Sequence, residues 1–142
     1  SDLFSSLTAP FQTATQEAVK REFNILSDKG VLIMNVIGVL NGPGSEHLAA
    51  QYATYKSVFP RVYLFPVARN ATNSRLVQNI ILVALKSTKE PRLSSANAEI
   101  QDYLSHRLSN DSHLSGGTVF TDDFAPLEIY ASRIYAMLDK EL

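Results

Sequence analysis

Two long apolar runs divide the chain and predict its main strands. The stretches Gly30–Leu40 and Leu76–Lys86 are rich in Val, Ile and Leu and contain few polar residues. Apolar runs of this length are typical of strands that are covered on both faces of a sheet. A third run, Arg61–Val67, begins directly after Pro60 and predicts a shorter strand. We therefore expect these three runs to form one buried sheet.

Between and around these runs, apolar positions recur about every 3.6 residues, which predicts helices. Thr13 and Gln16 have the spacing of a capping box, and Gly30 is a natural left-handed stop for the first helix. Ser45 can cap the second helix, and Pro126 fits the first turn of the last one. The four predicted helices cover residues 13–30, 45–59, 96–108 and 125–142.

The order of these elements predicts an α/β fold in a single domain, residues 1–142. Helices that alternate with apolar strands are typical of a mainly parallel sheet with helices on both faces. Only about eight residues join the second and third strands, however, whereas a parallel crossover needs about a dozen. We therefore expect parallel strands that end in an antiparallel strand pair.

Composition excludes several classes of protein. The 142 residues carry 13 basic and 14 acidic side chains with no basic cluster, so we expect no nucleic-acid partner. The absence of cysteine fits a reducing compartment, and we expect a cytoplasmic protein. No apolar run reaches the roughly 18–20 residues of a membrane span, and the N-terminus lacks the pattern of a signal peptide. His47, His106 and His113 show no ligand spacing, so we expect no metal.

Three stretches follow one another in a recognisable order. They are DLFSSLTAPFQTATQEAVKREFNILSDKGVLIMNVIG (residues 2–38), YATYKSVFPRVYLFPV (52–67) and TVFTDDFAPLE (118–128). Together they resemble the C-terminal half of spermidine synthase-like proteins of the class I S-adenosylmethionine-dependent methyltransferase family. The resemblance covers nearly the whole chain and implies the C-terminal half of a Rossmann-like methyltransferase sheet, without the N-terminal cofactor-binding half.

The resemblance also implies an activity. Such a protein transfers an aminopropyl or methyl group from an S-adenosyl sulfonium, S-adenosylmethionine or its decarboxylated form, to an amine acceptor. The family's donor site has a Gly-rich turn after its first strand and an acidic residue after its second, and this sequence has neither. The stretch GVLNGPG (38–44) follows a strand but lacks the G-x-G-x-x-G order. We therefore assign no cofactor-binding residue and expect the chain alone to be inactive.

Asp2 is the candidate catalytic residue. The family's aminopropyl transferases carry an Asp-x-x-Asp-Pro turn, in which a carboxylate orients and deprotonates the attacking amine. Asp2 matches the first Asp and Pro10 matches the Pro, but the second Asp is missing, which leaves polyamine specificity open and favours a methyltransferase-like or divergent activity. The alternative is that Asp2 belongs to a solvated chain terminus.

Three other polar residues have two interpretations each. Asp122 and Asp123 precede the helix that begins near Pro126, so they either favour its positive end or line a substrate-binding rim for an amine. Asn35, inside an apolar run, either holds a neighbouring loop or faces substrate.

A non-catalytic function is the alternative to the transferase. A half-sheet exposes an apolar edge, and such edges pair with other chains. In this interpretation the chain is a packing or oligomerisation module derived from the same fold. Both interpretations make a homo-oligomer an expected assembly.

Overall fold

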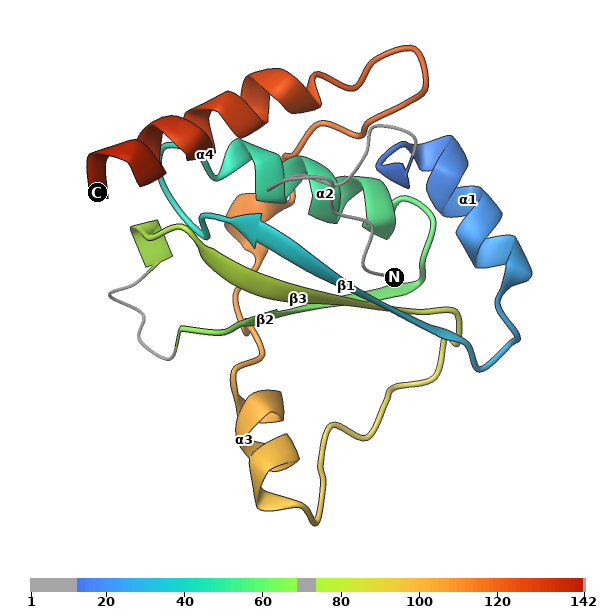
Figure 1. Ribbon diagram of the computed structural model, residues 1–142. Coiled ribbons are helices and arrows are strands. Elements are labelled where there is room, and N and C mark those ends of the chain that lie inside the picture. The colour runs from blue at the N-terminus through green and yellow to red at the C-terminus, as the bar shows by residue number, and fades with distance from the viewer. Residues whose placement is uncertain (1–12, 69–73, 142) are drawn as a thin grey trace.

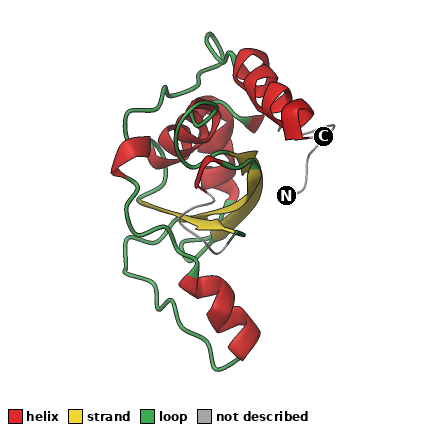
Figure 2. Ribbon diagram, turned by 90° about the vertical axis from the view of Figure 1, so that its left-hand side faces the viewer, coloured by secondary structure: helices red, strands yellow, loops and turns green. Residues whose placement is uncertain are grey.

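A computed structural model describes residues 13–68 and 74–141, which form a small sheet with helices on both sides (Figure 1). Helices α1, α2 and α4 lie on one side of the sheet and α3 lies on the other, as the view in Figure 2 also shows. The elements in chain order are α1 (Gln16–Ile25), β1 (Val31–Gly38), α2 (Glu46–Lys56), β2 (Arg61–Pro66), β3 (Gln78–Leu85), α3 (Ala98–Ser105), the 3-10 turn η3 (Ser112–Leu114) and α4 (Leu127–Glu141).

The three strands lie in the order β1-β3-β2, and β3 is antiparallel to both neighbours. Leu85 of β3 lies opposite Val31 of β1 on one side and opposite Arg61 of β2 on the other. The antiparallel pair β2/β3 confirms the prediction from the short connection. The prediction of parallel strands is wrong for the described sheet, because β3 separates β1 from β2 and leaves no parallel pair.

One face of the sheet forms the core. Ile80, Leu82 and Ala84 of β3 are fully buried, together with Tyr52 and Tyr55 of α2. This burial is the main stabilising term of the fold, since each fully buried large apolar side chain contributes about 1.5–3 kcal/mol.

The opposite face is less covered than the apolar runs predict. Burial alternates along β1, and Ile33 remains 56% exposed. Helix α3 contributes no fully buried residue, so its contact with this face is loose. The expectation that both faces of the strands are covered is therefore wrong for β1 in the described part of the chain.

The helix ends correct two predicted caps. Thr15, not Thr13, is the N-cap of α1, and its side chain accepts a hydrogen bond from the Ala18 amide at 3.3 Å. Ser45 precedes α2 but makes no side-chain capping bond. Asn97, which the sequence analysis passed over, caps α3 by accepting hydrogen bonds from the first amides of that helix.

None of the helices in the described ranges is long and apolar enough to cross a membrane.

Candidate functional site

The segment before α4 is bonded to α1 through the backbone and to α2 through a side chain. The Gln16 amide donates to the Phe120 carbonyl at 2.7 Å, and the Phe120 amide donates to Thr54 Oγ1 at 2.9 Å. Thr121 and Phe124 then close a tight turn with two backbone hydrogen bonds of 3.0 Å. Asp122 and Asp123 are the two central residues of this acidic turn, Thr121–Phe124.

Asp122 is bonded to the first turn of α1, although the sequence suggested α4. The hydroxyl of Thr15, a fully buried residue, donates to Asp122 Oδ1 at 2.6 Å. The backbone amide of Asp122 donates to Glu17 Oε2 at 3.0 Å. Asp122 therefore fixes the N-terminus of α1, where the helix dipole favours negative charge.

Asp123 is oriented differently. Its residue is exposed, and its carboxylate forms no hydrogen bond or ion pair with any residue in the described ranges. The Asp123 carboxylate is therefore available to a ligand, whereas one oxygen of Asp122 is already engaged.

The acidic side chains of the turn, Asp122 and Asp123, and that of Glu17 in the first turn of α1 have no basic partner among the described residues. No described Lys, Arg or His forms an ion pair with any of them, and the nearby Lys20 donates instead to Gln16 Oε1 at 3.0 Å. Uncompensated carboxylates attract cations through the Coulomb term. The arrangement is suited to a positively charged ligand such as an ammonium group.

Asp2 and Pro10 lie outside the described residues. The described chain begins at Thr13, two positions before the N-cap Thr15 that bonds Asp122. The catalytic role of Asp2 remains a prediction.

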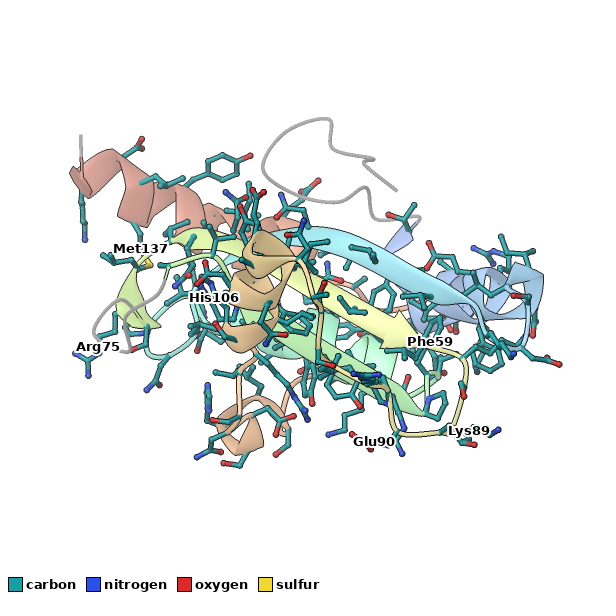
Figure 3. All side chains as sticks on the ribbon, turned by 90° about the horizontal axis from the view of Figure 1, so that it is seen from below. Phe59, Arg75, Lys89, Glu90, His106 and Met137 are labelled. Carbon is teal, nitrogen blue, oxygen red and sulfur yellow. The ribbon has the colours of Figure 1, made fainter. Side chains whose placement is uncertain are left out.

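The Gly-rich turn after β1 does not fit a phosphate or an adenosyl donor. Gly42 and Gly44 have φ values of 86° and 87°, which favour glycine. A Cβ atom at Gly44 would lie 2.9 Å from the sulfur of Met137, so α4 already occupies the space beside the turn. Figure 3 shows Met137 and Arg75 at this end of the sheet. The turn is filled by the protein itself, and we derive no donor binding from the described residues.

Asn35 lies on the less covered face of the sheet. Its amide donates to Asn79 Oδ1 of β3 at 3.1 Å, while its own Oδ1 has no partner within the described structure. The side chain thus holds a neighbouring strand and not a loop.

The described residues contain no group of three or more His, Asp or Glu side chains that could hold a metal ion. Two residues at the start of α1 that bond to Asp122, Thr15 and Glu17, were not predicted as part of the site from the sequence. Their signal was present, because a Thr followed by an acidic residue in the first helical turn is a typical N-terminus.

Comparison with known proteins supports the fold. No family model matches the chain, and no curated protein matches its sequence. The structure is similar to the crystal structure of a probable spermidine synthase from Corynebacterium glutamicum, with a TM-score of 0.62 and 18% identity. The chain has a partial spermidine synthase-like fold. The match covers 87% of this chain and 46% of the other, so the chain spans about half the length of that protein.

This likeness confirms the resemblance drawn from the three sequence stretches at the level of the fold. At 18% identity it carries no residue roles, and the activity of the longer protein is a matter for proposal.

Proposed function

We propose that this chain is the C-terminal portion of a spermidine synthase-like transferase, which moves an aminopropyl or methyl group from an S-adenosyl sulfonium to an amine acceptor. Two observations support the proposal. The fold is similar to about half of a probable spermidine synthase. The acidic turn is bonded to the start of α1 through Asp122 and carries carboxylates with no basic partner among the described residues, and this is the observation that favours an amine as the ligand.

In this proposal the residues of this chain act on the acceptor. An ammonium group is not a nucleophile, so a carboxylate must accept its proton or orient the amine, and we assign that role to Asp2. Asp123 holds the positive charge of the acceptor, and Asp122 keeps the turn in place through Thr15. The donor belongs to residues outside the described chain, and the chain alone is inactive.

Calorimetric titration with spermidine tests the acceptor side. Asp123→Asn removes the free carboxylate without touching the Thr15 bond, and we expect a loss of affinity of about two- to fivefold, typical of an exposed ion pair. Asp139→Asn is the control, because Asp139 is exposed on α4, away from the turn. Equal affinities for the two variants would contradict the assignment of Asp123.

The donor side is tested separately. Titration of the unmodified chain with S-adenosylmethionine and with its decarboxylated form should give no binding heat. Tight binding of either donor would show that the chain holds the donor site itself, and that its place in the fold is wrong.

A second candidate function is a non-catalytic packing or oligomerisation module. Strand β1 lies at the edge of the described sheet, and no described strand pairs with its outer side. The neighbouring apolar side chains of Val31 and Ile33 are 47% and 56% exposed. Exposed edges of this kind favour pairing with another chain, and we propose a homo-oligomer through β1.

Sedimentation analysis tests this second candidate. The unmodified chain should associate with increasing concentration, and Ile33→Lys should reduce the association, because a charged side chain on an edge strand opposes pairing with another chain. The control Ile25→Lys changes an exposed apolar residue at the end of α1. A monomer at every concentration would contradict the oligomer.

A further inference from the structure

A polar cavity of about 220 Å³ lies beside the N-terminal half of β2, and its lining includes no residue of the acidic turn. The end of α2, the first part of β2 and the loop after α3 form its walls. Figure 3 marks this end of the sheet with Phe59 and Glu90. The chemistry-bearing residues of the lining are Tyr52, Lys56, Arg61, Tyr63, Arg107 and Asp111.

Arg107 supplies unused hydrogen-bond donors to this cavity. Its guanidinium carbon lies 4.5 Å from the centre of the Tyr63 ring, in a cation–π contact. Stacking engages the face of the guanidinium and leaves the N–H groups at its edge free. The Arg107 side chain makes no hydrogen bond or ion pair within the described ranges. The Tyr63 ring therefore holds an arginine in place without satisfying its charge.

Lys56 supplies a second cation from the opposite wall. Its ammonium donates to the Tyr52 hydroxyl at 3.2 Å and lies 3.9 Å from Asp111 Oδ2. The Tyr52 hydroxyl in turn donates to Asp111, and this hydrogen bond holds the pKa of the Asp111 carboxyl below its usual range. Asp111 is thus negatively charged, and it accepts its hydrogen bond from Tyr52 and not from Lys56. The Lys56 ammonium has three N–H donors and therefore retains donors for another anion.

The backbone of β2 adds a further donor. The Leu64 carbonyl accepts from the Leu108 amide at 2.8 Å, so the backbone groups of Leu64 point away from β3. Backbone groups two residues apart on a strand point the same way, and those of Val62 therefore also point outward. Val62 lines the cavity, and no bond of its amide or carbonyl to another described residue is found outside the sheet.

The charges do not cancel within the cavity. The guanidinium of Arg61 is already satisfied by Glu90 and by the Thr88 carbonyl, with bonds of 2.9 and 2.8 Å to the latter. Asp111 offsets one of the two remaining cations, Lys56 and Arg107. The cavity lining therefore carries one net positive charge. It also contains the unbonded edge of the Arg107 guanidinium and the Val62 residue, whose amide points away from β3.

We propose that this cavity binds a small organic carboxylate, held by Arg107, Lys56 and the Val62 amide. Guanidinium groups match the two oxygens of a carboxylate, and one negative charge balances the lining. A volume of about 220 Å³ lies below the range of roughly 300–1,000 Å³ of sites for drug-sized ligands, so the ligand is small. The site does not depend on the proposed transferase activity.

Amide NMR titration of the full chain with sodium acetate tests the site. We expect saturable shifts at Val62 and at residues 107–111, and none of these with sodium chloride at equal ionic strength. Arg107→Gln should weaken acetate binding about tenfold, the usual effect of losing a hydrogen bond to a charged group. Arg92→Gln is the matched control, because the Arg92 side chain bonds only Ser94 nearby.

Lys56→Gln gives an independent test should Arg107→Gln fail to fold, and it should also weaken acetate binding. Shifts that are linear in acetate, or reproduced by sodium chloride, would overturn the proposal. Equal acetate affinity in the Arg107→Gln and Arg92→Gln proteins would overturn it as well. Tighter binding of inorganic phosphate than of acetate would contradict the assignment to a carboxylate.

Discussion

His47 offers a direct test of the packing around α2. The residue is 2% exposed, and its Nδ1 atom has no hydrogen-bond partner in the described structure. Burial lowers the pKa of His47 from 6.5 to about 4. Between these two values the unfolded chain binds a proton that the folded chain excludes, so the free energy of unfolding must decrease as the pH falls.

The magnitude follows from the same two pKa values. At about 1.36 kcal/mol per unit, the interval from 6.5 to about 4 corresponds to about 3 kcal/mol. This contribution to the free energy of unfolding is fully present above pH 6.5, the pKa of His47 in the unfolded chain, and it is lost as the pH falls to about 4, the pKa in the folded chain. By about pH 4.5 we expect a loss of roughly 2.5 kcal/mol relative to pH 7.

Urea denaturation at a series of pH values measures this effect when the unmodified chain is compared with His47→Gln, which cannot titrate. The raised pKa of Glu22, caused mainly by burial, has the opposite effect in an overlapping window. The Glu22 contribution cancels when the stability of the His47→Gln protein is subtracted from that of the unmodified chain, because both proteins contain Glu22. His113→Gln, which replaces an exposed histidine whose ring bonds the Leu40 carbonyl, is the control for exchanging a histidine outside the core.

Parallel stability curves for the unmodified chain and His47→Gln between about pH 7 and pH 4.5 would refute the reasoning. They would mean that the His47 ring is hydrated in the folded chain, and that α2 does not pack as described.

Substitutions at three further places in the fold test individual contacts by urea denaturation. Thr15→Ala removes the cap of α1 and its bond to the acidic turn, and should cost about 1–2 kcal/mol, whereas Thr15→Ser should retain most of the stability. Gly117→Ala should destabilise by about 1–3 kcal/mol, because the new Cβ atom would lie 2.0 Å from the Ala49 carbonyl oxygen. Gly116→Ala, with nothing within 4 Å, should be nearly neutral. Lys86→Met should cost about 1–2 kcal/mol, because its ammonium bonds two of the last carbonyls of α1 at 2.8 and 3.0 Å.

Some of the candidate site could be anticipated from the sequence, and some could not. The pair Asp122 and Asp123 was visible as adjacent acids before a helix, and the sequence placed them at the nearest helix end. The structure instead bonds Asp122 to the start of α1, through Thr15, which lies 107 positions away in the sequence. The Tyr52–Asp111 pair of the polar cavity was missed for the same reason, since its members are 59 positions apart.

The sequence alone determined the local elements. Apolar runs located β1, β2 and β3, because burial in a sheet requires apolar side chains whatever the topology. Periodicity located the four α-helices, although their ends moved inward by several residues from the predicted limits. The antiparallel pairing of β2 and β3 also followed from the sequence, because so short a connection cannot cross over to a parallel neighbour.

Only the tertiary structure decided which strands are neighbours and which face is covered. The insertion of β3 between β1 and β2 leaves an edge strand whose Ile33 is exposed, and the apolar run containing Ile33 gave no sign of this. An apolar side chain has the same local preference whether a helix covers it or not. Its burial depends on contacts between segments far apart in the chain, and these exist only once the whole fold has formed.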